Sequence, residues 1–89
     1  MIRVLASPAF KKTFKKMIKA NPDLRDRFQA RLLLFVNDPF DPILRTHKLS
    51  GKLSEYWSFR VTHDLRVVFA FEGSDLAILV DFGSHDEVY

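Results

Sequence analysis

The side chains best suited to chemistry in this sequence are histidines and arginines in its C-terminal half. The histidines are His47, His63 and His85, and two arginines, Arg60 and Arg66, flank the middle one. Near neutral pH one histidine can take a proton while another donates one, and arginine stabilises charge that develops on a phosphate group. These groups could cut RNA by activating its own 2′-hydroxyl group. For each histidine alone, a place in a surface loop is the alternative.

A metal-dependent reaction is not indicated by these residues. The spacing of the histidines matches no zinc motif, and the chain contains no cysteine. We therefore expect no metal site and no other cofactor.

Two runs of alternating apolar and polar residues, 57–61 and 65–71, predict adjacent antiparallel strands. In the register that pairs their apolar positions, Arg60 lies opposite Arg66 on the face away from the core. Like charges directly opposite each other are destabilising, so the pair is tolerated most readily when a phosphate or carboxylate group lies between the arginines. The alternative is neutralisation by a nearby carboxylate, either Asp64 or Asp81.

Before these strands, the sequence predicts a short strand and two helices. Residues 1–6 form an apolar run typical of a strand, and Ser7-Pro8 is a typical helix start. The first helix ends at Asn21-Pro22, and Pro22-Asp23 begins the second, so we expect an antiparallel helix pair. Their expected core faces, at helical spacing, are Phe10, Phe14, Met17 and Ile18 in the first helix and Leu24, Phe28, Leu32 and Phe35 in the second.

After the second helix, residues 38–54 are expected to form a long irregular connection, a kind of segment that often has a function in small domains. Three strands follow, joined by the turns 62–64 and 72–75. The expected fold class is α+β, with a strand, two helices and a three-stranded antiparallel meander in one domain over residues 1–89. In the last strand, the alternation places Leu76, Ile78, Val80 and Phe82 on one face.

Positive charge is concentrated near the N-terminus. The 89 residues carry a net charge of +3, yet residues 1–22 hold six basic side chains and no acidic one. Such a patch is typical of proteins that bind a nucleic acid, an anionic membrane or an acidic protein, and equally of a solvated helix face. No apolar run approaches the roughly 18 residues of a membrane span, and no signal peptide is evident, so we expect a cytoplasmic protein without a membrane partner.

The strand region resembles a known family. Leu49–Val61, Asp64–Phe69 and the C-terminal Gly83–Tyr89 are similar to the RelE/ParE toxin superfamily, and within it to the YoeB-like and YafQ-like messenger-RNA interferases of type II toxin–antitoxin modules. The hairpin has the YoeB-like pattern Tyr-Trp-Ser-x-Arg, whereas the tail has a YafQ-like Gly-Ser-His. The resemblance covers nearly the whole chain and implies a RelE-like fold.

The resemblance also implies roles for individual residues. His47 takes the place of the general base, His85 that of the general acid, and Arg66 that of the arginine that holds the scissile phosphate, while Arg60 matches a further catalytic arginine. Asp64 and Tyr89 occupy supporting positions, Tyr89 at a terminal aromatic that orients the substrate. The lysines expected to bind RNA are Lys11, Lys12, Lys15, Lys16, Lys19, Lys48 and Lys52.

The activity implied by the resemblance is metal-independent cleavage of messenger RNA in the ribosomal A site, which inhibits translation. The products would carry a 2′,3′-cyclic phosphate and a 5′-hydroxyl group, and the partners would be messenger RNA, ribosomal RNA and a cognate antitoxin. Two alternatives come from the same superfamily: a ParE-like inhibitor of DNA gyrase, and an inactive toxin-like protein that only binds an antitoxin. The pair of His47 and His85 argues against the ParE-like alternative.

Overall fold

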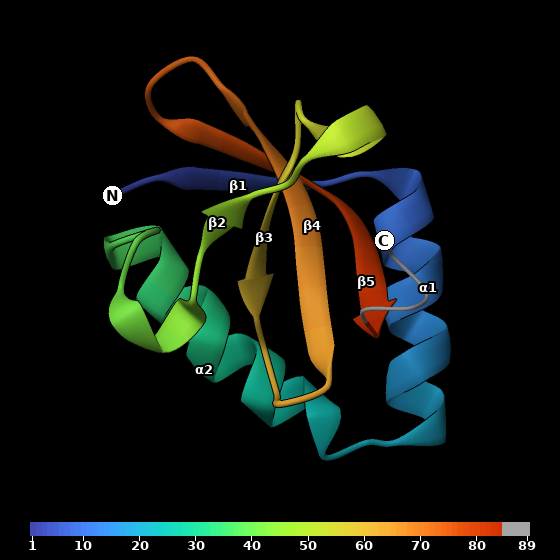
Figure 1. The fold of residues 1–89 in the computed structure, drawn as a ribbon. Helices are drawn as coiled ribbons and strands as arrows, with labels where there is room; N and C mark the ends of the chain where they lie inside the picture. The colour runs from blue at the N-terminus through green and yellow to red at the C-terminus, as the bar shows by residue number, and fades with distance from the viewer. Residues whose placement is uncertain (85–89) are drawn as a thin grey trace.

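The fold combines two layers, a twisted sheet and the helices α1 and α2 on one of its faces. A computed structural model describes residues 1–84, and within them the sheet has five strands in the order β1-β5-β4-β3-β2. Strand β1 is parallel to β5, and every other neighbouring pair is antiparallel. The elements, drawn in Figure 1, are β1 (Arg3–Ala6), α1 (Pro8–Ala20), α2 (Leu24–Asn37), a 3₁₀ turn η1 (Pro42–Leu44), β2 (His47–Lys48), a second 3₁₀ turn η2 (Gly51–Leu53), β3 (Trp57–Arg60), β4 (Leu65–Glu72) and β5 (Leu76–Ser84).

The expected α+β class is confirmed. The strand, the helices and the three-stranded meander follow one another in the expected order. Within residues 1–84, no helix is both long enough and apolar enough to cross a membrane.

Helix α1 begins and ends where the sequence indicates. The Ser7 side-chain oxygen accepts a hydrogen bond from the Phe10 N–H group at 3.1 Å, and Pro8 occupies the first helical position. Phe10 and Ile18 are buried, while the lysines of this helix are exposed. The apolar face of α1 therefore contacts the sheet, and its lysines face solvent.

The two helices reverse direction as expected, but they splay apart and do not pack side by side along their lengths (Figure 1). From the turn after α1, helix α2 runs obliquely away from α1 across the back of the sheet (Figure 1). The helices meet through the Phe14 and Phe28 rings, whose centroids lie 4.6 Å apart. Each helix then follows the sheet rather than the other helix, because the sheet offers the larger apolar surface.

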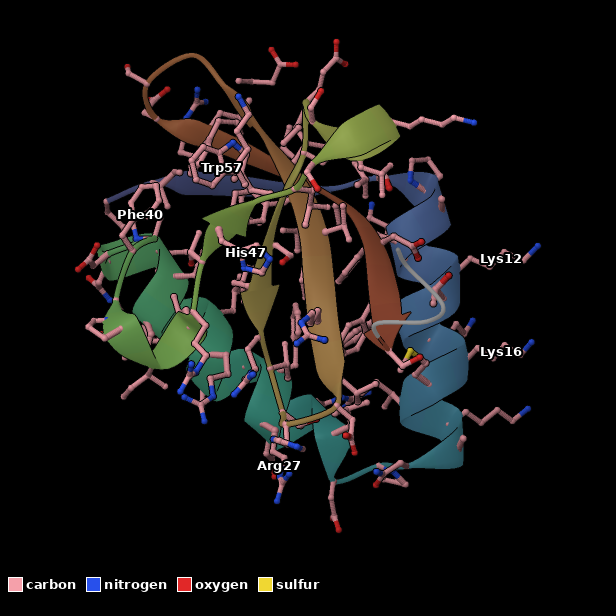
Figure 2. The ribbon with its side chains drawn as sticks, viewed as in Figure 1. Lys12, Lys16, Arg27, Phe40, His47 and Trp57 are labelled. Atoms are coloured by element: carbon pink, nitrogen blue, oxygen red, sulfur yellow. The ribbon has the colours of Figure 1, made fainter. Side chains whose placement is uncertain are left out.

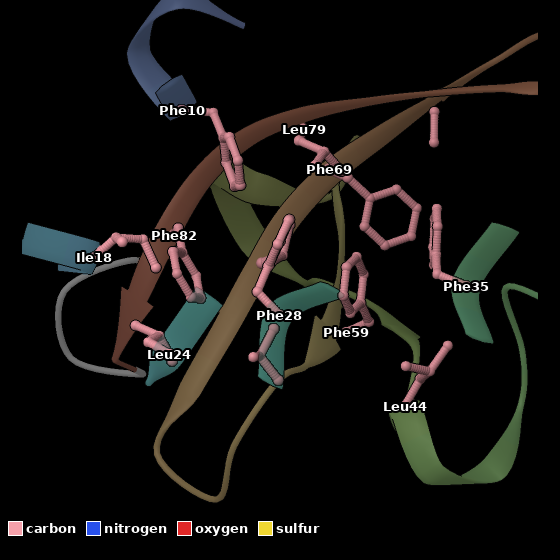
Figure 3. Close-up of a cluster of buried hydrophobic side chains, with 13 residues drawn as sticks. Phe10, Ile18, Leu24, Phe28, Phe35, Leu44, Phe59, Phe69, Leu79 and Phe82 are labelled. Atoms are coloured by element: carbon pink, nitrogen blue, oxygen red, sulfur yellow. The ribbon is translucent and has the colours of Figure 1, made fainter. Parts of the chain in front are cut away.

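The core between α2 and the sheet is built largely of phenylalanine rings (Figure 3). Phe35 of α2 stacks on Phe59 of β3 with a centroid distance of 4.6 Å, and it meets Phe69 of β4 edge-on at 4.8 Å. All three residues are completely buried. Aromatic pairs at these distances contribute about 0.5–1.5 kcal/mol beyond the burial of their area, so this cluster holds β3 and β4 against the helix.

The expected hairpin register is confirmed. Phe59 pairs with Val67, and Arg60 pairs with Arg66, which leaves residues 62–64 as the turn. The Thr62 hydroxyl oxygen accepts hydrogen bonds from the N–H groups of Asp64 at 3.3 Å and Leu65 at 3.1 Å. A short polar side chain thus supplies the hydrogen bonds that a tight turn requires.

The expected alternation in the last strand is wrong. Val68 pairs with Asp81 and Phe69 with Leu79, so Val80 has no partner and forms a bulge in β5. An extra residue of this kind changes which positions face the core. The buried apolar residues of β5 are consequently Ala77, Leu79 and Phe82, and Leu76, Ile78 and Val80 are only half-buried.

The connection over residues 38–54 is more regular than expected. Two aspartate turns begin it: the Phe40 N–H group donates to Asp38 Oδ1 at 3.0 Å, and the Ile43 N–H group donates to Asp41 Oδ1 at 2.9 Å. Leu44 is completely buried and anchors the segment to the core. These local contacts direct the chain back along the sheet edge, where β2 pairs with β3. A strand of two residues is too short to produce a periodic pattern in sequence.

We predict that Phe35→Ala lowers the free energy of unfolding by about 3–5 kcal/mol, because truncation of a buried aromatic ring leaves a cavity. Urea denaturation followed by circular dichroism measures the change. Leu33→Ala on the same helix is the matched control, since Leu33 is 63% exposed; its effect should stay within about 0.5 kcal/mol. Equal losses in the two variants would contradict the placement of Phe35 at the centre of the core.

Candidate active site

The open face of the sheet, opposite α1 and α2, carries the candidate catalytic side chains. Residues that lie directly opposite each other on neighbouring strands project to the same face. Phe59 and Val67 project toward the helices, so the positions next to them project to the open face. One row across the strands contains His47, Ser58, Val68 and Asp81, and the next row contains Arg60, Arg66 and Gly83.

The two arginines occupy the closest kind of cross-strand pair. The Val61 N–H group donates to the Leu65 carbonyl at 2.9 Å, so the adjacent Arg60 and Arg66 form a pair without backbone hydrogen bonds between them. In such pairs the Cα atoms are about 4.5 Å apart and the side chains are nearest. The expectation that Arg60 and Arg66 are neighbours on the face away from the core is therefore confirmed.

Arg60 has an unsatisfied donor. Its Nε atom is buried and has no hydrogen-bond partner within residues 1–84, although the residue as a whole is only half-buried. A buried donor without a partner costs about 1–3 kcal/mol, and such a group needs an explanation such as a missing ligand. An anion that reached this nitrogen after a rotation of the Arg60 side chain would supply the missing acceptor.

The alternative of neutralisation by Asp64 or Asp81 is not observed for Arg60. Within residues 1–84, neither carboxylate forms an ion pair with Arg60, and the Asp81 carboxylate accepts the Phe82 N–H group at 2.8 Å. Asp64 is exposed in the hairpin turn, where it lines a hollow on the helix side together with Asn21 and Asp23. The structure thus does not bring Asp64 into the row that holds the arginines.

His47 has a defined hydrogen-bonding state. Its Nδ1 atom lies 3.0 Å from the carbonyl oxygen of Arg45. A carbonyl oxygen only accepts hydrogen bonds, so Nδ1 must carry the proton, and the neutral ring then keeps its lone pair on Nε2. The ring is exposed on the open face (Figure 2), so Nε2 is available as a proton acceptor.

Arg45 is the residue that sequence reasoning missed. It adopts a left-handed backbone conformation with φ of 49°, and it is the one residue other than glycine with positive φ within residues 1–84. This conformation turns the Arg45 carbonyl toward the ring of His47. No sequence signal pointed to it, because residues other than glycine rarely adopt this conformation.

The sequence also predicts that Ser58 projects to the same face of the sheet as Arg60. It lies between Tyr56 and Arg60 in the alternating pattern, so the same parity that places Arg60 outward places Ser58 outward. The structure shows it 1% exposed, in the row of His47.

His47 and Arg60 are close enough to act on one group. Arg60 is one strand across and two residues along from His47, which corresponds to about 8 Å between Cα atoms at ordinary strand spacings. Long side chains at that separation can converge on a single phosphate. The predicted His85 and Tyr89 lie outside the described residues.

The predicted RNA-binding lysines fall into separate groups. Those of α1 lie on the outer surface of the helical layer, and Figure 2 shows Lys12 and Lys16 pointing away from the sheet. Lys48 pairs with Trp57, so it projects to the face opposite His47, whereas Lys52 is exposed in η2. The α1 lysines therefore cannot contact a phosphate held by Arg60 and Arg66.

Within residues 1–84, no three histidine, aspartate or glutamate side chains gather closely enough to hold a metal ion. His47 and His63 belong to different segments, the connection after η1 and the hairpin turn.

Comparison with known proteins identifies the family of this chain. A family model described as bacterial toxin of type II toxin–antitoxin system, YafQ, matches residues 2–89. This chain belongs to the YafQ toxin family. A toxin named YoeB from Synechocystis is 31% identical to it over 70 residues, which cover 79% of this chain and 73% of that protein.

Solved structures show the same fold as this YafQ-family toxin. A metal-bound toxin from Helicobacter pylori is 27% identical, with a TM-score of 0.77 and full coverage of both chains. YafQ of Escherichia coli, in its complex with DinJ, is 18% identical with a TM-score of 0.80, covering 100% of this chain and 99% of that one. The expected membership of the RelE/ParE superfamily is confirmed.

We predict that Arg60→Met leaves the free energy of unfolding unchanged or raises it by up to about 1 kcal/mol. The substitution removes an unsatisfied buried donor and a like-charge neighbour of Arg66 while it keeps an apolar stem. Urea denaturation measures the effect, and sulfate should raise the melting temperature of the parent toxin more than that of the variant.

Arg3→Met is the control for this measurement. Arg3 pairs with Asp75 at 3.4 Å on the surface, so its loss should cost less than about 1 kcal/mol and leave the response to sulfate intact. A large destabilisation by Arg60→Met would show that Arg60 has a structural role instead.

Proposed function

We propose that this YafQ-family toxin is an endoribonuclease that cuts messenger RNA in the ribosomal A site and so stops translation. The observation that carries the proposal is the Arg60 Nε donor beside Arg66, which has no partner within residues 1–84, with the exposed His47 ring in the neighbouring row. This arrangement places an acceptor for a proton and donors for a phosphate on one face of the sheet.

In the proposed reaction His47 Nε2 takes the proton of a 2′-hydroxyl group. The freed oxygen attacks the adjacent phosphorus, and Arg60 and Arg66 stabilise the charge that develops on the non-bridging oxygens. The bond from phosphorus to the 5′-oxygen then breaks, and this oxygen receives a proton from a general acid, which we assign to His85. The products are a 2′,3′-cyclic phosphate and a 5′-hydroxyl end, and no step requires a metal ion.

We also propose that the toxin binds an antitoxin. In Escherichia coli the structurally similar YafQ forms a complex with DinJ. In this chain the edge strand β1 leaves Leu5 58% exposed. An exposed apolar side chain on an open strand edge is a common feature of surfaces that another chain covers.

The lysine face of α1 is proposed as the surface that docks on ribosomal RNA. Lysines on a helix surface attract phosphates without regard to sequence, and the attraction weakens with added salt. Because Lys12 and Lys16 point away from the sheet that carries the arginine pair (Figure 2), their contribution would be to binding and not to the chemical step. Action on ribosomes would place the protein in the cytoplasm.

We predict that His47→Gln lowers the rate of messenger-RNA cleavage by roughly 10²–10⁴-fold, because glutamine cannot accept the proton. His47→Glu supplies a carboxylate base at the same position and should recover part of the loss. Primer extension on messenger RNA bound to purified ribosomes measures both rates. Full cleavage by the glutamine variant would exclude His47 as the base.

The parent toxin in the same assay tests the activity itself. If it made no cuts but inhibited DNA supercoiling by gyrase, the ParE-like alternative would replace this proposal. If it did neither and still bound an antitoxin, the chain would be an inactive toxin-like protein.

We predict that Lys12→Gln/Lys16→Gln weakens binding to ribosomes. The slope of log affinity against log salt concentration should fall in magnitude by about 1 for each phosphate that the lysines no longer neutralise. Sedimentation with ribosomes at several salt concentrations measures the slope. The control is Arg3→Gln/Arg25→Gln, which removes the same charge from exposed positions on β1 and α2. An unchanged slope in the lysine variant would identify the lysines as an ordinary solvated face.

A further inference from the structure

A second cluster of basic side chains surrounds a hollow between α2 and the tip of the β3–β4 hairpin. The hollow has a volume of about 380 Å³ and is lined by Arg27, Arg31 and Leu34 of α2 and by Val61, Thr62 and His63 of the hairpin. We call it the hairpin hollow. Figure 2 shows Arg27 at this end of the molecule, away from Lys12 and Lys16.

Among residues 1–84, the side chains that line the hairpin hollow itself include basic ones and no acidic one. Arg27 and Arg31 are one helical turn apart, which places their Cβ atoms about 5–6 Å from each other. Arg27 and Thr62 also border the neighbouring hollow that holds Asp23 and Asp64, but within residues 1–84 neither Arg27 nor Arg31 forms an ion pair. Like charges at this spacing repel, so the arrangement is best accommodated by an anion held between the two guanidinium groups.

The floor and the wall of the hollow add further contacts. Val61 is 2% exposed and, with the half-buried Leu34, provides an apolar floor. The Thr62 hydroxyl oxygen already accepts two backbone N–H groups, which leaves its own proton free to donate. His63 is exposed beside it, and one nitrogen of its ring donates in either tautomer. A nucleotide presents both a phosphate and an apolar ring, so it matches this combination.

The position of the hollow favours a polymer over an isolated anion. Arg60 ends β3, and Thr62 follows two residues later, so the hairpin carries the arginine pair on one side and the hollow at its tip. A strand with a phosphate in every unit can bridge both places. An acidic peptide offers no such regular repeat of charge.

We propose that the hairpin hollow binds a backbone phosphate of the RNA strand that Arg60 and Arg66 hold, one or a few nucleotides away from the cleaved bond. This role for Arg27, Arg31 and His63 rests on the proposed action on RNA. It also gives His63 a binding function in place of a catalytic one.

The test uses a fluorescent single-stranded RNA with 2′-O-methyl groups, which cannot be cleaved, and measures its affinity for the full chain at several salt concentrations. Arg31→Gln should weaken binding about 3- to 10-fold and reduce the salt slope by about 0.7, the value for one neutralised phosphate on a single strand. Arg25→Gln is the matched control, because Arg25 is on the same helix, carries the same charge and does not line the hollow. It should leave the salt slope unchanged and lower the RNA affinity only slightly, through the loss of one positive charge.

Two further variants keep the proposal open to refutation if Arg31→Gln unfolds. Arg27 is exposed, so Arg27→Gln should fold normally and give a similar loss of affinity. Arg31→Lys retains the charge and should retain the salt slope, with a smaller loss of affinity because lysine lacks the planar fork.

Equal effects of Arg31→Gln and Arg25→Gln would overturn the proposal, since net charge alone would then explain them. Unchanged RNA affinity together with weaker binding of an acidic antitoxin peptide would overturn it in favour of a protein partner. Failure of the proposed function is visible separately, because the parent toxin would bind the uncleavable RNA and still leave messenger RNA intact.

Discussion

The structure depends on the contact between Phe35 of α2 and the rings of Phe59 and Phe69. This contact fixes which residues of β3 and β4 face the helices. Side chains alternate with a period of two along a strand, so a shift of one residue in either strand would move the apolar rings into solvent and the arginines into the core. The cost of burying two guanidinium groups without partners is far larger than any local preference. The hydrophobic layer therefore determines the position of Arg60 and Arg66 on the opposite face.

The placement of His47 has a different physical origin. Strand β2 is too short to be held by its own pairing, and the segment depends on anchors at both sides, with Leu44 completely buried and Leu49 only 8% exposed. Between these anchors the left-handed Arg45 directs its carbonyl to the histidine ring. The arginine pair is thus positioned by the core of the domain, whereas the histidine is positioned by local turns at the edge of the sheet.

This difference explains what the sequence could and could not predict. The helix start at Ser7, the core faces of α1 and α2 and the hairpin register follow from capping and periodicity, and all are observed. The resemblance of the strand region and of the Gly-Ser-His tail correctly indicated the RelE/ParE superfamily. Strand β2 and the splayed helices depend on contacts between distant segments, and the left-handed Arg45 is a local feature of a residue type that rarely adopts this conformation, so no periodic pattern encodes them. The hairpin hollow is a similar case, because it joins residues of α2 and the hairpin that are more than one helix length apart in sequence.

The bulge at Val80 has a consequence for the tolerance of the chain to insertions and deletions. Val80 is the unpaired residue between Leu79 and Asp81. Leu79 projects toward the helices and Asp81 projects to the opposite face, as they would in a regular strand without Val80. Loss of Val80 would leave Leu79 and Phe82 on the core face, so relatives of this toxin can differ by one residue here and keep the same site. In β3 the same change in length between Phe59 and Arg60 would turn the arginine inward. Strand β5 can therefore vary in length over evolution, whereas β3, which carries Arg60, must keep its length constant.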